Sequence, residues 1–137
     1  MSQENVEIVE LLFRGVNRRA NAADLDALVD EYFDPTVVWE GVDESLDRGP
    51  FRGRVEVLAH IRSWMETLDA FRSEPEQIID AGESVVVVQR SHGILKGSNA
   101  EVETRFASVW GMRDRKVVSH KQYQHLAEAL KAAGLEE

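Results

Sequence analysis

Residues 102–125, with the sequence VETRFASVWGMRDRKVVSHKQYQH, contain the pattern that decides the fold. Two stretches, 102–112 and 116–125, are rich in β-branched and aromatic residues, and a short Asp-containing segment separates them. Consecutive strands joined by a short turn lie next to each other and run antiparallel. This segment therefore predicts two antiparallel neighbours in a sheet.

The segments on either side of this pair extend the prediction. Upstream, residues 76–80 and 84–92 look like two more strands, joined by the turn Asp80-Ala81-Gly82-Glu83. Downstream, residues 126–133 are rich in Ala and Leu, and Gly134 follows where a glycine often ends a helix. The second half of the chain is thus predicted to be four strands and a closing helix.

The first half of the chain is mainly helical. Apolar residues recur at helical spacing from Ser2 to Ala20, again from Leu25 to Phe33, and a third time from Val55 to Leu68. Between the second and third helices, residues 36–39 read as a strand and residues 41–53 as a loop that lies at the rim or lid of a site. Because the helices are segregated from a mostly antiparallel sheet, the predicted fold class is α+β.

Composition limits the organisation of the chain and its partners. At 137 residues the chain, residues 1–137, fits a single domain. Asp and Glu total 25 against 16 Lys and Arg, and the net charge of -9 disfavours nucleic acid and anionic membranes as partners. The absence of cysteine excludes disulfides and thiolate chemistry.

The location of the protein is predicted from its N-terminus and its apolar runs. The N-terminus lacks the basic and apolar pattern of a secretory signal, so the predicted location is the cytoplasm. The longest aliphatic run, Val85 to Val88, is far shorter than the roughly 20 residues that span a bilayer. No membrane association is therefore expected.

Alternation along the last three strands sorts their side chains onto two faces. The even-numbered sets are apolar at one end and then aromatic, uncharged polar or titratable, which is the mixture typical of a small-molecule pocket. The odd-numbered sets include Glu103, Arg105 and Lys121, which suit solvent or a subunit interface. We therefore predict that the even-numbered side chains face inward, namely Ser84, Val86, Val88, Arg90 and His92, then Val102, Thr104, Phe106, Ser108 and Trp110, and finally Val118, His120, Gln122 and Gln124.

Several motifs along the chain resemble the SnoaL-like proteins of the nuclear-transport-factor-2-like superfamily, and their order and spacing together are specific for that fold. The matching segments are Phe13 with Asn17, residues 23–28 (ADLDAL), 34–40 (DPTVVWE), 51–54 (FRGR), 79–82 (IDAG), 105–110 (RFASVW), 113–117 (RDRKV) and 128–135 (EALKAAGL). The resemblance implies a cone-shaped fold, in which about three helices and a short C-terminal helix pack on a curved, mixed, mostly antiparallel sheet. It also implies a homodimer formed through the outer face of the sheet.

The superfamily contains polyketide cyclases, ketosteroid isomerases, epoxide hydrolases, dehydratases and modules that only bind, so the fold does not decide the function. In the epoxide hydrolase branch, an Arg and two Asp residues occupy positions that correspond here to Arg90, His92 and Gln122. The Arg is present, but both carboxylates are replaced. In the isomerase branch, the general-base Asp lies near Trp39, and Glu40 is one residue away. The resemblance therefore does not identify a reaction.

Histidine and arginine side chains are the candidate chemical groups. His92 and His120 are predicted as the catalytic acid and base, because imidazole exchanges protons near neutral pH; the alternative is that each only hydrogen-bonds within a polar wall. Arg90 is predicted to bind a substrate carboxylate or an oxyanion, with a buried ion pair, for example to Glu40, as the alternative. Gln122 would orient the ligand.

The remaining candidates are aromatic or hydroxyl-bearing residues expected to contact the ligand. They are Tyr32, Trp39, Phe51, Trp64, Phe106, Ser108 and Trp110. No close-spaced pair of metal ligands occurs, so neither a metal nor another cofactor is expected. The hypothesis is a cofactor-independent pocket protein that binds an apolar or aromatic metabolite and catalyses a cyclisation, isomerisation or dehydration. The alternative is a non-catalytic ligand-binding or interaction module.

Overall fold

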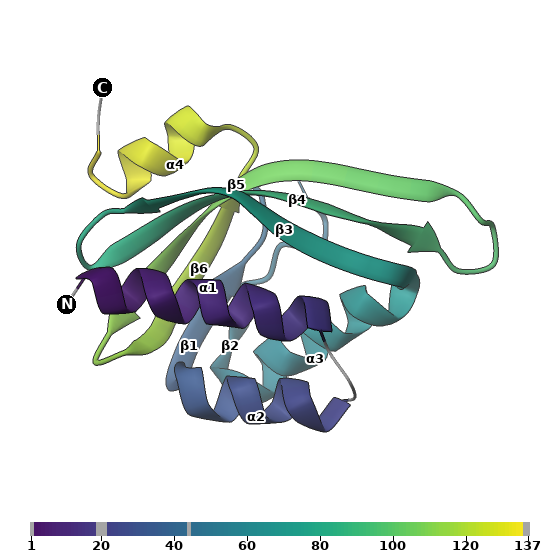
Figure 1. The fold of residues 1–137 in the computed structure, drawn as a ribbon, viewed down its shortest axis with the longest axis horizontal. Coiled ribbons are helices and arrows are strands. Elements are labelled where there is room, and N and C mark those ends of the chain that lie inside the picture. The colour runs from purple at the N-terminus through teal and green to yellow at the C-terminus, as the bar shows by residue number, and fades with distance from the viewer. Residues whose placement is uncertain (1, 19–21, 44, 136–137) are drawn as a thin grey trace.

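The computed structural model describes residues 2–18, 22–43 and 45–135. Within these residues, there are four helices and one six-stranded sheet. Figure 1 shows how the helices pack against the sheet. In chain order the elements are α1 (Ser2–Arg18), α2 (Ala22–Tyr32), β1 (Phe33–Glu40), β2 (Phe51–Arg52), α3 (Gly53–Thr67), β3 (Leu68–Asp80), β4 (Ser84–Leu95), β5 (Glu101–Arg113), β6 (Lys116–Tyr123) and α4 (Leu126–Ala132).

The strands lie in the order β2-β1-β6-β5-β4-β3. The β1 and β6 pair is parallel, and each of the other neighbouring pairs is antiparallel. The pair predicted from residues 102–125 is confirmed as β5 and β6, with Trp110 opposite His120. The sheet is therefore mixed and mostly antiparallel, and the predicted α+β class is confirmed.

The two faces of the sheet carry different helices. Helices α1, α2 and α3 lie on one face, which we call the inner face, and α4 lies on the opposite, outer face (Figure 1). The main core fills the space between the inner face and the three helices, and fully buried Val9, Val37, Val57 and Val117 are part of it. A smaller cluster, built around Val86, Ala107 and Ala129, holds α4 on the outer face.

Three boundaries differ from the sequence prediction. Leu68 and Phe71, which continue the apolar spacing of the third helix, lie in β3, because the chain reaches the sheet edge there. Both side chains are still buried, and Ala70 between them has a φ of +53° where the strand register shifts. The two-residue strand β2 lies inside the predicted loop, and Phe33 begins β1 instead of ending a helix.

The buried face of α3 is also rotated from the predicted one. Val55 was expected in the core but is 83% exposed, whereas Val57 is fully buried. Because residues three and four apart share a helix face, this rotation places His60, Ile61 and Trp64 beside the core. None of the described helices is both long enough and apolar enough to cross a membrane.

Candidate ligand-binding cavity

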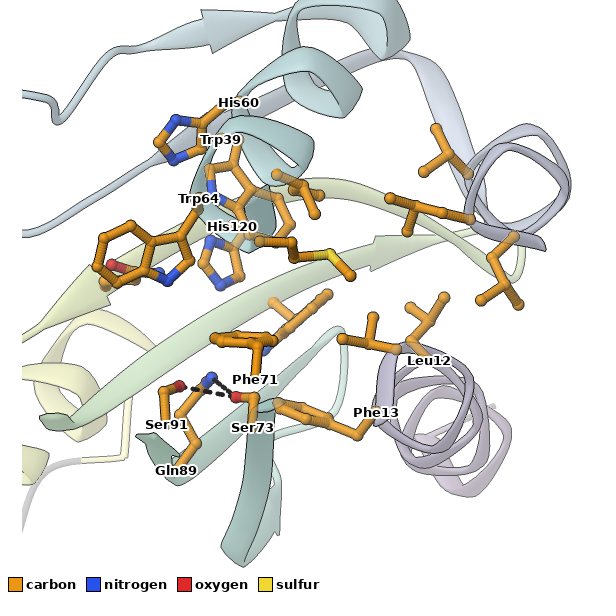
Figure 2. A pocket seen from close by; sticks show the side chains of 18 of the residues that line it. Leu12, Phe13, Trp39, His60, Trp64, Phe71, Ser73, Gln89, Ser91 and His120 are labelled. Atoms are coloured by element: carbon orange, nitrogen blue, oxygen red, sulfur yellow. Dashed lines mark hydrogen bonds between the residues drawn. The ribbon is translucent and has the colours of Figure 1, made fainter. Parts of the chain in front are cut away.

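A cavity of about 120 Å³ lies between the inner face of the sheet and the helices α1 to α3. Figure 2 shows side chains from helices and strands converging on it. Most of the lining residues are apolar: Leu12, Phe13, Val16, Leu25, Leu28, Val29, Phe33, Trp39, Ile61, Trp64, Met65, Phe71, Phe106 and Trp110. The polar ones are His60, Ser73, Gln89, Ser91, His120 and Gln122. An apolar cavity with a few polar groups is the usual form of a small-molecule site.

An aromatic group holds the imidazole of His120 in this cavity. The His120 ring stacks on Trp39, with 3.6 Å between ring centroids and 15° between planes. On another side it meets Trp110 edge to face, with centroids 4.6 Å apart and planes at 78°. The parallel pairing of β1 with β6 places Trp39 beside His120, and the antiparallel pairing of β5 with β6 places Trp110 beside it. Three strands therefore fix the position of this ring.

The buried setting keeps His120 uncharged. The residue is 2% exposed, and its Nδ1 atom has no hydrogen-bond partner among the described residues. Burial, and to a smaller extent the electrostatic effect of His60, lower the pKa of the imidazole to about 3. At neutral pH the ring is therefore a neutral hydrogen-bonding group, with one N–H donor and one nitrogen acceptor.

A hydrogen-bonded network of uncharged side chains forms another part of the wall. Gln89 Nε2 donates to Ser73 Oγ, and Ser108 Oγ donates to Gln89 Oε1, both at 2.9 Å. Trp110 Nε1 donates to Ser108 Oγ at 2.9 Å, and the hydroxyls of Ser73 and Ser91 lie 2.9 Å apart. Figure 2 shows the Gln89, Ser73 and Ser91 part of this network beside Phe71.

The network is anchored to α1 outside the sheet. Asn17 Nδ2 donates to the carbonyl oxygen of Ser73, and the backbone N–H of Ser73 donates to Asn17 Oδ1, each at 2.8 Å. This two-bond clamp ties the middle of β3 to the end of α1. It fixes the Ser73 hydroxyl at the cavity wall.

His60 is a cavity residue that the sequence analysis did not select. Its ring stacks on Phe51, with centroids 4.0 Å apart, and its Nδ1 lies 3.6 Å from Asp47 Oδ2. Burial lowers its pKa, and the nearby Asp47 carboxylate partly offsets that effect. The available signal was its helical spacing with Val57, Ile61 and Trp64, which places all four on one face of α3.

The predicted direction of the β4 side chains is wrong. Gln89 and Ser91 line the cavity, whereas Arg90 and His92 lie on the outer face. Arg90 approaches Glu103 at 3.8 Å, and His92 Nε2 lies 3.3 Å from Glu74 Oε1. Neither side chain lines the cavity, so neither can contact a ligand there.

The register between β4 and β5 explains this reversal. Gln89 pairs with Phe106 and Ser91 pairs with Thr104, so odd positions of β4 share a face with even positions of β5. Sorting every strand by the same parity assumed the opposite register. A shift of one residue exchanges the two faces of a strand.

Strands β5 and β6 follow the predicted direction over most of their length. Phe106, Trp110, His120 and Gln122 line the cavity. The register shifts between Gly111 and Met112, and as a result Val117 instead of Val118 joins the main core. Gln124 was also expected to face inward, but it is exposed beyond the end of β6.

The other predicted contact residues differ in their distance from the cavity. Trp39 and Trp64 line it, and because Trp64 is also 45% exposed, it lies where the cavity meets solvent. Ser108 is fully buried behind the lining, within the network. Phe51 and Tyr32 pack against the core outside the lining.

Glu40 and the predicted loop lie at the edge of the sheet. Glu40 pairs with Lys121 in the sheet register, and its Oε2 lies 3.7 Å from Lys121 Nζ. Lys121 Nζ also donates to Asp43 Oδ1 at 2.8 Å, and this bond lowers the pKa of the Asp43 carboxyl. Glu40 is absent from the cavity lining.

Across the part of the chain that the structure describes, no three His, Asp or Glu side chains gather into a metal site.

Comparisons with known proteins agree on the fold. The family model of the SnoaL-like domain matches residues 13–120. A putative SnoaL-like polyketide cyclase from Jannaschia sp. CCS1 has a TM-score of 0.77 at 18% identity, covering 99% of this chain and 95% of that one. An NTF2-like protein of unknown function from Burkholderia pseudomallei K96243 has a TM-score of 0.74 at 22% identity, covering 93% and 95%.

A third structure has a bound small molecule. It is a hypothetical protein with a ketosteroid isomerase-like fold from Catenulispora acidiphila DSM 44928, in complex with trimethylamine, with a TM-score of 0.70 at 17% identity, covering 94% of this chain and 93% of that one. A comparison with curated proteins gives no match. At these identities the structural likeness shows the fold alone.

Proposed function

The chain belongs to the SnoaL-like domain family, and we propose that it binds a compact, mainly apolar small molecule in the cavity on the inner face of its sheet. The observation that carries this proposal is the setting of His120. A neutral imidazole, one of whose nitrogens has no partner among the described residues, is held between two tryptophans in a mainly apolar cavity. A buried polar atom without a partner costs stability, so its retention at a cavity wall favours a role in binding.

A second candidate function is proton-transfer catalysis on the bound molecule, such as cyclisation, isomerisation or dehydration. It is favoured by the presence of a second imidazole, His60, at the same cavity. Since burial lowers the pKa of both rings, each is a weak base at neutral pH. His120 would then act by polarising a substrate oxygen through a hydrogen bond, as neutral imidazoles do in other enzymes. His92, which lies on the outer face, has no part in this candidate mechanism.

Binding is tested by filling the cavity. Val16 lines the cavity, and the variant Val16→Phe would occupy part of its volume. The matched control is Val55→Phe, the same change at a residue that is 83% exposed. We expect native mass spectrometry to detect a co-purified small molecule on the wild-type protein and on Val55→Phe, and to find it lost or strongly reduced on Val16→Phe. Equal ligand content in all three proteins would contradict binding in this cavity.

Binding and catalysis are separated with the recovered molecule. It is incubated with the wild-type protein and with His120→Phe, a variant that keeps a ring to stack on Trp39. Conversion by the wild type alone supports the enzyme, whereas binding without conversion by either protein supports the binding module. A circular dichroism melt of the variant checks that it is folded.

A further inference from the structure

Polar groups that line the cavity come from strands that are not neighbours, with His120 on β6 and the hydroxyl pair of Ser73 and Ser91 on β3 and β4. Their positions describe the ligand. We propose that the ligand is an uncharged molecule about the size of one six-membered ring, with a hydrogen-bonding oxygen at each of two opposite ends. One oxygen meets His120 and the other meets the hydroxyl pair of Ser73 and Ser91. This inference rests on the proposed binding function and specifies its chemical class.

The proposed size of the ligand follows from the volume and the lining of the cavity. Its volume is about 120 Å³. An apolar cavity of roughly 150 Å³ in another protein holds one benzene molecule. The lining also suits a ring, since Phe71, Phe106 and Trp110 present flat apolar surfaces to the same space. A single ring with short substituents is therefore the upper limit of what this cavity holds.

The neutrality follows from the composition of the wall. Among the described lining residues there is no Asp, Glu, Lys or Arg, and burial lowers the pKa of both lining imidazoles, His120 and His60, which favours their neutral forms. A carboxylate or ammonium group would lose its hydration on entry without gaining an opposite charge. The cavity therefore selects against ions.

One end of the site is the hydroxyl pair of Ser73 and Ser91. Ser73 Oγ already accepts a hydrogen bond from Gln89 Nε2, and a single hydrogen bond joins the two hydroxyls. Two hydroxyls carry two hydrogens, and the bond between them uses one. The other hydrogen is free to donate to an oxygen of the ligand. Both residues line the cavity and are 6% exposed, so bulk water does not compete strongly for this donor.

The other end is His120. It lies on β6, two strands away from the Ser91 strand β4, with β5 between them. Within the part of the chain that the structure describes, its Nδ1 has no partner, and a neutral imidazole can donate one hydrogen bond and accept another. Because Phe106 and Trp110 of β5 line the wall between these two ends, the middle of the ligand is expected to be apolar.

Four para-substituted benzenes of similar shape test this description by isothermal titration calorimetry. para-Methoxyphenol has an oxygen at each end, para-ethylphenol has one, and para-ethyltoluene has none. para-Hydroxybenzoate has an oxygen at each end and a negative charge. Because an unmatched buried polar group is costly, we expect each replacement of an oxygen by carbon to weaken binding about tenfold. The benzoate should bind at least as weakly as the hydrocarbon.

Variants at the two ends assign the oxygens. The double variant Ser73→Val/Ser91→Val replaces both hydroxyls with methyl groups and adds one further methyl at each residue. The double variant Ser73→Thr/Ser91→Thr is the matched control of nearly the same volume that keeps both hydroxyls. The double valine variant should abolish the preference for one of the two oxygens, and the double threonine variant should retain it. His120→Phe should abolish the preference for the other oxygen. Melting curves of the variants confirm that they are folded.

The outcomes separate this inference from the proposed function. The two-ended description is overturned if the hydrocarbon binds as tightly as para-methoxyphenol, if the benzoate binds best, or if the double valine and double threonine variants behave alike. In each of those cases binding in the cavity still stands. If none of the four compounds binds, and the co-purified molecule is equally present on Val16→Phe, then the proposed function fails as well.

Discussion

The inner and outer faces of the sheet both carry polar residues. On the inner face these residues are buried and hydrogen-bonded within the protein, and on the outer face they are exposed to water. On the inner face Gln89 is 6% exposed, uncharged and hydrogen-bonded at both ends of its amide. On the outer face the adjacent Arg90 side chain is 46% exposed and lies 3.8 Å from Glu103, whose side chain is also largely in solvent. Gln89 and Arg90 are adjacent residues of β4.

This difference follows from the exposure of each face to water, which limits the residue types that the face can carry. A buried polar group must find its partner within the protein, and a buried charge costs far more than a buried amide or hydroxyl. The inner face therefore uses serine, glutamine and neutral histidine. The outer face keeps its charges hydrated, so ion pairs there contribute little to stability. Three experiments would test this contrast.

The largest effect on stability is expected when the pH is lowered, because His120 on the inner face is buried in its neutral form. The pKa of His120 in the folded protein is lowered to about 3, against a normal value of 6.5, so the unfolded chain binds a proton that the folded protein excludes. The contribution of this group to stability is fully present above its unfolded pKa and is lost as the pH falls toward the folded value. We expect a loss of about 1.4 kcal/mol per pH unit between about pH 6 and pH 4.

Urea unfolding at a series of pH values measures this loss. His120→Phe removes the titrating group and should show a shallower slope over the same pH range than the wild type. His60, whose pKa is lowered by partial burial, contributes with the same sign, so some slope should remain in the variant. Parallel curves for the two proteins would contradict a neutral, buried His120.

A smaller effect is expected from two neighbouring substitutions on opposite faces. Gln89→Leu removes the hydrogen bonds to Ser73 and Ser108 and leaves the Ser108 hydroxyl without its acceptor. We expect it to lower the free energy of unfolding by about 2 kcal/mol. Arg90→Leu, the matched change on the outer face, should alter it by less than about 0.5 kcal/mol. Denaturant unfolding measures the free energy of unfolding of both variants. Equal losses of this free energy would show that the two faces do not differ as described.

The smallest effect is expected at an outer ion pair. Arg105 Nε lies 2.6 Å from Glu76 Oε1, and the Arg105 side chain is largely exposed. A double-mutant cycle with Arg105→Ala and Glu76→Ala should give a coupling energy of roughly 0.2 to 1 kcal/mol that decreases as salt is added. A coupling above that range, or one unaffected by salt, would mean that this pair is shielded from solvent.

The positions of the two predicted catalytic histidines show what sequence patterns can and cannot determine. His120 lies in the cavity, in an aromatic setting, whereas His92 lies on the outer face beside Glu74. Both were assigned inward by alternation. Alternation establishes which residues of one strand share a face, but only the pairing with the next strand decides which face that is.

His60 and the polar network were missed for a related reason. The apolar spacing of α3 is compatible with two neighbouring faces, one that includes Val55 and one that includes Val57, and packing selected the second. Ser73 lies in a stretch of β3 that was not predicted to be a strand, and its partners come from α1 and β4. Contacts of this kind join residues far apart in the chain and leave no local pattern.

The sequence by itself determined the order of helices and strands apart from the short strand β2, the α+β class and the family resemblance, because these depend on local spacing and on the order of motifs along the chain. The sequence also identified five residues that line the cavity, namely Trp39, Phe106, Trp110, His120 and Gln122. Only the tertiary structure decided that Gln89 and Ser91, and not Arg90 and His92, face that cavity. The physical reason is that the register of a sheet is set by contacts between strands, and one residue of shift exchanges the buried face with the solvated one.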